Sequence, residues 1–200
     1  MNNLLIALQV EGLKIRKSKM IWITLAVFSL APIMGGFFML ILKDPEFAQS
    51  SGLLGAKAQL QGEATWPSYL GLLAQVIAVG GILVFGFVTS WVFGREYTDR
   101  TSKDLLALPY SRGIIVMAKF IAVFITSILL SIYVVVVGLL LGLVIGLPQW
   151  SSEILMHGIY ILLITTLLTL ALRTPVAFFS VEGQGYLAAW GFVVLRVCFS

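Results

Sequence analysis

The chain has 200 residues, of which 60% are hydrophobic and 11% are charged, and its formal net charge is +4. Soluble domains contain about 25% charged residues, so this composition and a mean hydropathy of +1.03 exclude an ordinary soluble domain. The basic residues flank apolar segments and do not form a stripe on one face, which argues against a nucleic-acid binder. The composition predicts an all-α, polytopic membrane helix bundle.

Four apolar segments are long enough to cross a bilayer, which takes about 20 residues. We expect membrane spans at residues 20–42, 69–93, 120–147 and 154–172, within one transmembrane domain that covers residues 1–200. Residues 1–19 precede the first span as a basic segment. Residues 186–200 begin a fifth apolar segment that is too short for a span, so we expect four full transmembrane helices and a truncated fifth.

The distribution of Lys and Arg predicts the orientation, because cytoplasmic loops carry an excess of these residues. Most of the basic residues beside the spans fall on one side: Lys14, Arg16, Lys17, Lys19, Arg95, Arg100, Lys103, Arg112, Lys119 and Arg173. The other side has only Lys43 and Lys57. We therefore expect a multi-pass protein of the cell membrane with a cytoplasmic amino terminus.

Glycines recur at four-residue spacing in the third predicted span, at Gly138, Gly142 and Gly146. They fall on one helix face, and without side chains they let a neighbouring backbone approach closely. The neighbour is either another helix of the same chain or a second subunit. In the first predicted span, Pro32 with Gly35 and Gly36 indicates a kink or a packing notch.

A polar segment between the second and third predicted spans covers residues 95–112 and reads REYTDRTSKDLLALPYSR. Thr98 or Asp99 can cap the start of a helix, and Pro109 ends it, because the residue before a proline avoids helical backbone. Three pairs of opposite charge are spaced i, i+4: Glu96–Arg100, Asp99–Lys103 and Arg100–Asp104. One face carries apolar and hydroxyl side chains: Tyr97, Thr101, Leu105 and Leu108. This pattern predicts a short amphipathic helix on the cytoplasmic surface and favours a docking element over a solvated linker.

Catalytic and metal sites find little support in the sequence. His157 is the only histidine and Cys198 the only cysteine, whereas a metal site needs several converging ligands. The spans contain no nucleophile–base pair. The hydroxyl residues Ser127, Ser131, Thr165, Thr166 and Thr169 are expected to bond to backbone carbonyls or to line a path. We expect no metal, no cofactor and no catalytic residue.

Several segments resemble the permease subunits of type-2 ATP-binding-cassette (ABC) exporters. Residues 93–112, FGREYTDRTSKDLLALPYSR, resemble their first cytoplasmic loop, and residues 11–24, EGLKIRKSKMIWIT, resemble their basic amphipathic amino-terminal helix. Residues 42–48, LKDPEFA, are similar to the start of their outer loop. Residues 174–179, TPVAFF, and residues 183–187 are similar to the segment after their fourth span. The similarity covers nearly the whole chain.

The resemblance implies a mechanism. Two permeases, either two copies or this chain with a sister permease, would form a translocation path, and separate ABC ATPase subunits would dock beneath them. Residues 95–112 would be the coupling helix. ATP hydrolysis would lie on the partner, since the sequence GLLGAK at residues 52–57 lacks the Gly-Lys-Ser/Thr spacing of a phosphate loop. Such exporters often carry antimicrobial peptides, antibiotics or other amphiphiles.

The resemblance also implies which residues contact the ATPase. The polar rim would be Glu96, Asp99, Arg100, Lys103 and Asp104. The apolar anchors would be Tyr97, Leu105 and Leu108, and Pro109 and Arg112 would fix the exit into the third span. These are contact residues and not catalytic ones.

The chain departs from the family pattern at its end. Family members continue through a fifth and a sixth span, whereas this sequence stops at Ser200, so we expect a truncated product or a fragment. The alternative function is a membrane anchor or immunity protein that does not transport. It would need no ATPase, and a transport assay in energy-depleted cells would separate the two.

Overall fold

The computed structural model describes residues 2–43, 64–98 and 111–172. These residues form five helices and, within these ranges, no strand: α1 (Asn2–Lys17), α2 (Lys19–Lys43), α5 (Trp66–Thr98), α7 (Arg112–Ile145) and α8 (Ser152–Leu172). The predicted all-α class is confirmed. The predicted fifth span at residues 186–200 and the middle of the predicted coupling helix lie outside the described residues.

Four of the helices, α2, α5, α7 and α8, are long and apolar enough to cross a membrane, so the predicted polytopic bundle is confirmed. Two of them exceed their predicted spans. Helix α5 continues past Phe93 to Thr98, and α7 begins at Arg112 instead of near Phe120. With 33 and 34 residues at about 1.5 Å per residue, each is much longer than a hydrocarbon slab of about 30 Å. Their charged ends therefore project beyond the slab.

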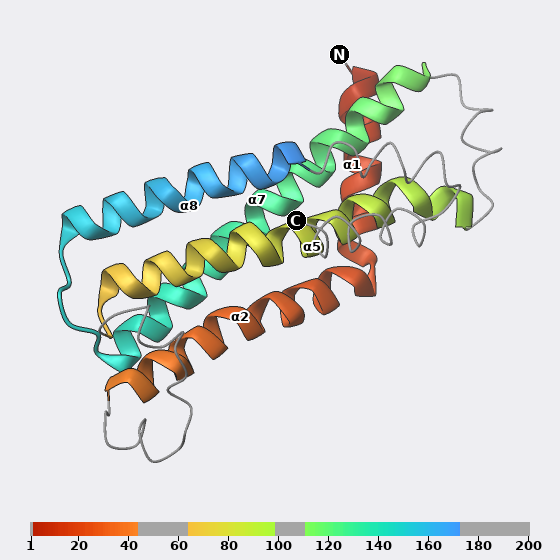
Figure 1. Ribbon diagram of the computed structural model, residues 1–200. Coiled ribbons are helices and arrows are strands. Elements are labelled where there is room, and N and C mark those ends of the chain that lie inside the picture. Colours follow the sequence, from red (N-terminus) through yellow and green to blue (C-terminus); the bar gives the residue numbers. More distant parts are fainter. Residues whose placement is uncertain (1, 44–63, 99–110, 173–200) are drawn as a thin grey trace.

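Helix α5 occupies the centre of the bundle and contacts α8, α7 and α2. In Figure 1, α2, α5 and α8 run side by side and α7 crosses them obliquely. The chain alternates in direction, so that the start of α2, the end of α5, the start of α7 and the end of α8 lie at the same end of the bundle. Helix α1 lies across this end, which we call the α1 end, and packs against α7 (Figure 1).

The sharp turn between α1 and α2 depends on Ser18. Its backbone N–H donates to the carbonyl of Ile15 at 3.1 Å, and its hydroxyl accepts a hydrogen bond from the Met20 N–H at 3.0 Å. A serine hydroxyl that accepts from a backbone N–H in the first turn is a helix N-cap. Ser18 therefore ends the surface helix and starts the first spanning helix.

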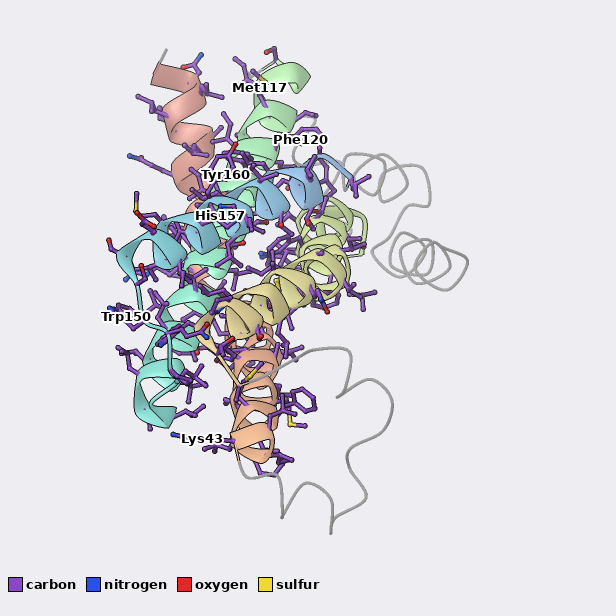
Figure 2. All side chains as sticks on the ribbon, turned by 60° about the vertical axis from the view of Figure 1, so that its left-hand side comes forward. Lys43, Met117, Phe120, Trp150, His157 and Tyr160 are labelled. Carbon is purple, nitrogen blue, oxygen red and sulfur yellow. The ribbon has the colours of Figure 1, made fainter. Side chains whose placement is uncertain are left out.

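The glycines of α7 allow a close approach to α5. A Cβ at Gly138 would come within 2.5 Å of Leu73, and one at Gly142 within 2.6 Å of Trp66. Both glycines therefore face another helix of the same chain. Gly146 instead ends α7 with φ 66°, and Lys43 donates to the carbonyls of Ile145 and Gly146 at 2.9 and 3.3 Å. Figure 2 shows Lys43 at this opposite end of the bundle.

The first spanning helix, α2, has glycines where it packs against α5 and α7. Helix α2 continues through Pro32. Beyond it, a Cβ at Gly35 would lie 3.1 Å from Leu72 of α5, and one at Gly36 would lie 3.1 Å from Ile145 of α7. The absence of side chains at these positions thus lets α2 pack against α5 and α7 at once.

Candidate functional site

The predicted coupling segment is bounded by two helices. Glu96 and Tyr97 lie in the last turn of α5, and Arg112 is the first residue of α7. The remaining predicted contacts lie outside the described residues: Asp99, Arg100, Lys103, Asp104, Leu105, Leu108 and Pro109. Thr98, a predicted helix start, is the last residue of α5. The candidate site is therefore built from the two flanks of the segment and from α1.

Four charged side chains meet at these flanks. Glu96 of α5 accepts hydrogen bonds from Lys119 of α7 at 2.8 Å and from Lys14 of α1 at 3.2 Å. Glu11 of α1 accepts one from Lys14 at 2.8 Å and lies 3.5 Å from the Lys119 ammonium. We call Glu11, Lys14, Glu96 and Lys119 the four-charge cluster. It connects three helices that are far apart in sequence.

The cluster is largely withdrawn from solvent. The side chains of Lys119, Glu11 and Glu96 are only 6%, 8% and 12% exposed, and that of Lys14 is 29% exposed. Buried charges are costly unless they are paired and hydrogen-bonded. Here two carboxylates face two ammonium groups, so the formal charges cancel. Lys119 also donates to the carbonyl of Val92 at 3.1 Å, which occupies a further proton of its ammonium group.

The helix geometry explains why these residues meet. Glu11 and Lys14 are three residues apart on α1, which places them on the same helix face. Burial lowers the pKa of Lys14, but the hydrogen bond and charge of Glu11, followed by those of Glu96, outweigh it and raise this pKa above 10.5. Lys14 is therefore held in its charged form, as the pairing requires.

The arrangement ties the two ends of the predicted coupling segment together. Glu96 is near the end of α5 and Lys119 is near the start of α7, and they pair directly. Glu96 thus turns toward the interior of the α1 end, although the sequence assigned it to the rim of a partner contact. The four side chains are paired with one another, so the cluster holds α1, α5 and α7 together and presents no reactive group.

Sequence reasoning missed Glu11, Lys14 and Lys119 as site residues. Lys14 and Lys119 were used only to predict orientation, and Glu11 was only part of the basic amino-terminal segment. A signal was nevertheless present. Glu11 is the single acid in residues 1–19, and Lys119 is the single charge within the apolar run from Gly113 to Leu147. An isolated charge in such a setting requires a partner from elsewhere.

The hydroxyl residues of the spans bond mainly to their own helices. Thr165, Thr166 and Thr169 donate to the carbonyls four residues earlier, at 2.8, 2.8 and 2.7 Å, and Ser127 does so at 2.9 Å. The predicted bonding to backbone carbonyls is confirmed for these four. Ser131 is buried without a hydrogen-bond partner among the described residues.

His157 lies on α8, exposed, beside a largely apolar cavity of about 340 Å³ that Glu153 also lines (Figure 2). Within the described ranges, no group of three or more His, Cys, Asp or Glu residues is placed to hold a metal ion. The four-charge cluster is thus the most developed polar assembly in the described part of the chain, and it joins helices instead of presenting ligands.

The comparison with known proteins identifies the family. The family model described as "ABC-2 family transporter protein" matches residues 7–199. The chain belongs to this family. The resemblance seen in the sequence is therefore confirmed, and together with the four apolar helices it makes the chain a multi-pass membrane permease of the ABC-2 type.

A curated relative of this ABC-2 permease is similar over part of its length. It is the "Bacitracin transport permease protein BCRB" of Bacillus licheniformis, 28% identical over 120 residues. The similarity covers 60% of this chain and 58% of the relative, so the chain spans little more than half of the relative's length in the match. No solved structure matches the chain significantly.

Proposed function

We propose that this ABC-2 permease is the membrane subunit of an ATP-driven exporter, and that a separate ATPase docks on residues 95–112. The observation that carries the proposal is the family match, because it extends over residues 7–199 and includes both flanks of that segment. The sequence has no phosphate loop. In this proposal the energy for transport comes from a partner chain.

The four-charge cluster supports a coupling role for the segment. Since Glu96 and Lys119 join α5 to α7, a force on residues 99–110 would move both helices and would not merely bend a loop. Helix α5 contacts α2, α7 and α8, so that its displacement would reach the whole bundle. In this proposal Glu96 positions the segment from the membrane side. The contact role stays with the other predicted residues: Tyr97, Asp99, Arg100, Lys103, Asp104, Leu105, Leu108, Pro109 and Arg112.

We place the α1 end in the cytoplasm and the protein in the cell membrane. The described basic residues gather at that end: Lys14, Arg16, Lys17, Lys19, Arg95 and Lys119. At the opposite end the described residues include only Lys43. This asymmetry is the one that cytoplasmic surfaces of membrane proteins carry. The ATPase would therefore meet the segment from the cytoplasm, where ATP is available.

The name of the relative supports one class of substrate. Its name describes a bacitracin transport permease, and it is 28% identical to this chain over 120 residues. We infer an antimicrobial peptide, antibiotic or other amphiphile as the exported substrate. The exposed surfaces of the spanning helices are apolar, with large side chains such as Leu30, Met34 and Leu129 turned outward, which suits a path for an amphiphile along or between permeases.

A second permease is favoured by one outward-facing polar residue. Gln75 lies on α5, nine residues beyond its start at Trp66, hence about 13 Å along the helix and near the middle of a bilayer. Its side chain is exposed, and no hydrogen bond to it is found among the described residues. An amide facing lipid is costly. A second copy of the chain would satisfy it, because an amide both donates and accepts.

The test is to purify the tagged chain from its native membranes and to assay the eluate for ATP hydrolysis. Mass spectrometry should identify a protein with an ATP-binding cassette in the same eluate. We expect a variant in which Leu105 and Leu108 are both changed to Asp to insert normally but to lose this ATPase, because two charges replace the apolar anchors. Changing Leu53 and Leu54 to Asp is the matched control, since the same charges are then added to the predicted outer loop.

Three outcomes distinguish docking on residues 95–112 from docking elsewhere and from the absence of an ATPase. Loss of the ATPase only from the Leu105 and Leu108 variant supports docking on residues 95–112. Equal retention in both variants removes that contact from the proposal. If the wild-type chain brings no ATPase at all, the exporter proposal fails and a membrane protein that does not transport takes its place.

A further inference from the structure

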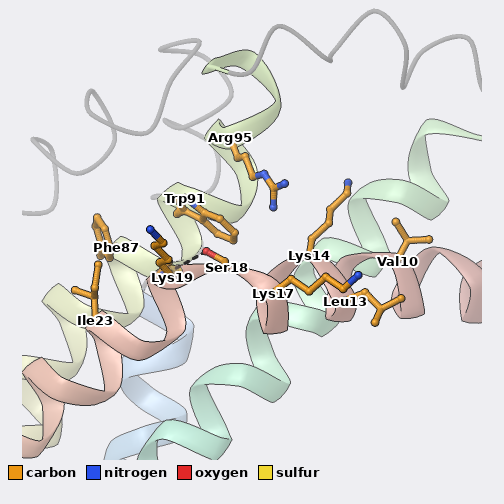
Figure 3. Close-up of a pocket in the computed structure, with 11 residues that line it drawn as sticks. Val10, Leu13, Lys14, Lys17, Ser18, Lys19, Ile23, Phe87, Trp91 and Arg95 are labelled. Carbon is orange, nitrogen blue, oxygen red and sulfur yellow. Dashed lines mark hydrogen bonds between the residues drawn. The ribbon is translucent and has the colours of Figure 1, made fainter.

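A basic cavity of about 800 Å³ opens at the α1 end between α1, α2 and α5. Its cations come from three places in the sequence: Lys14 and Lys17 of α1, Lys19 at the start of α2, and Arg95 near the end of α5. Figure 3 shows these side chains around the turn at Ser18, with Trp91 and Phe87 of α5 beside them. No Asp or Glu is among the described residues that line it.

Two of these cations have no acidic partner among the described residues. Lys14 belongs to the four-charge cluster, and Arg95 lies over the Trp91 ring at 5.0 Å from its centroid. In contrast, neither Lys17 nor Lys19 has a carboxylate within 4.0 Å in the described part of the chain. They flank Ser18, where α1 turns into α2, so both reach the same cavity. The cavity therefore offers uncompensated positive charge to an anion.

The cavity continues into an apolar groove. A second cavity of about 440 Å³ lies between α2 and α5, and Ile23 and Phe87 line both. Farther along, its walls include Val27, Ala31, Val76 and Gly80. Its one hydroxyl, on Thr24, already donates to the Met20 carbonyl at 2.8 Å. The groove is therefore lined by apolar side chains, and its one hydroxyl needs no hydrogen bond from a ligand.

The dimensions match half of a bilayer. Lys19 and Ala31 are twelve residues apart on one helix, which corresponds to about 18 Å. The hydrocarbon of one leaflet is about 15 Å thick. A molecule with its charge at Lys17 and Lys19 would therefore extend its apolar part along Ile23, Val27 and Ala31.

We propose that the basic cavity and the apolar groove together bind one anionic phospholipid from the leaflet on the α1 side. Its phosphate lies between Lys17 and Lys19, and one acyl chain lies in the groove between α2 and α5. Basic pockets between membrane helices are suited to anionic headgroups. A soluble phosphate would use the cations but would leave the adjoining apolar groove without a role, which is why we favour the lipid. The proposal needs neither an ATPase nor transport, so it stands apart from the proposed function.

The test measures lipid binding to the whole chain in detergent by native mass spectrometry. Phosphatidylglycerol is titrated against phosphatidylcholine of the same acyl chains. We expect preferential retention of phosphatidylglycerol, and a roughly tenfold loss of that preference when Lys17 and Lys19 are both changed to Gln, because each cation adds to the attraction. The control is Arg16→Gln, which removes a neighbouring charge of α1 that lines a different cavity.

A second pair of variants tests the binding of the acyl chain in the groove and leaves the charge of the protein unchanged. Ala31→Leu fills the groove and should weaken the binding of phosphatidylglycerol, whereas Ala26→Leu adds the same volume at an exposed position of α2 that lines neither cavity. Inorganic phosphate and glycerol phosphate are added as competitors. Neither should displace the lipid.

Three results would each contradict the proposed lipid site. If Arg16→Gln weakens binding as much as the lysine changes do, the attraction is a general surface effect and the site is rejected. If inorganic phosphate displaces the lipid and Ala31→Leu has no effect, the cavity binds a soluble anion. If both lipids bind equally to the wild-type chain, the proposal is wrong. Circular dichroism of each variant verifies that the helices are retained.

Discussion

Glu96 and Lys119 form a buried ion pair of 2.8 Å that closes the two ends of a segment the sequence assigns to a cytoplasmic partner. Lys119 also donates to the carbonyl of Val92, so that α5 and α7 are joined here by a second hydrogen bond. The pair lies at the α1 end of the bundle and is only 12% and 6% exposed, because α1 covers it and adds Glu11 and Lys14. The surface helix is thus part of the joint between α5 and α7.

Removing one member of this pair should destabilise the protein more than removing both. Glu96→Gln leaves two ammonium groups facing one carboxylate, and breaking a buried pair in this way costs about 3–5 kcal/mol. That should lower the Tm in detergent by roughly 10 °C. Changing Glu96 and Lys119 to Gln together restores charge balance, so the Tm should recover in part.

The control is Glu153→Gln, because Glu153 is an exposed acid at the start of α8 and forms no ion pair within the described ranges. Its Tm should match that of the wild-type chain. A double variant that is as unstable as the sum of the two single variants would show that charge imbalance is not the cause.

The pKa of Lys14 predicts how the cluster responds to alkali. Because this pKa is raised above 10.5, the stability contributed by charged Lys14 is fully present below pH 10.5 and is lost as pH rises through the higher folded value. The Tm difference between the wild-type chain and Lys14→Gln should therefore be constant up to pH 10.5 and shrink above it. Lys17→Gln, which removes a cation of α1 that has no acidic partner in the described residues, is the matched control.

The positions of the spanning helices could be predicted from the sequence, whereas the contacts between their ends could not. Apolar segments of sufficient length place α2, α5, α7 and α8, because burial in lipid needs only a continuous run of apolar residues. At the α1 end, α5 continues past the predicted span end at Phe93 and α7 begins before Phe120, and the sequence does not reveal that Glu96 and Lys119 satisfy each other there. The pairing of Glu11 with Lys119 joins positions that are far apart, and no local pattern specifies such a contact. The residues assigned to the partner contact remain predictions.

The glycines of α7 should differ in their tolerance of a methyl group. At Gly142 the added Cβ would lie 2.6 Å from the Trp66 ring, which is held between Tyr69 and Trp150 with centroids 6.4 and 4.7 Å away. Gly142→Ala should therefore cost about 1–3 kcal/mol by overpacking.

At Gly138 the added Cβ would meet only the flexible end of Leu73, so Gly138→Ala should cost less than Gly142→Ala. Gly12→Ala is the control, because a Cβ there meets nothing within 4 Å, and alanine favours a helix over glycine by about 1 kcal/mol. Thermal unfolding in detergent checks the order. Equal destabilisation at Gly142 and Gly12 would contradict the close packing of α7 on α5.

The exposed amide of Gln75 predicts a contact between two copies of the chain. In a two-fold symmetric pair a residue beside the axis faces its own copy. If the axis passes beside Gln75, Gln75→Cys in membranes forms a disulfide-linked dimer under mild oxidation. A cysteine at Val79, one turn along the exposed face, should cross-link as well, whereas one at Ile77, which is fully buried, should not. Cys198 is replaced by Ser in all variants, so that every cross-link comes from the introduced thiol. A product of twice the chain's mass supports the pair of copies. A product of another mass identifies a sister permease and overturns the symmetric pair, and no product at Gln75 or Val79 shows that this face meets lipid.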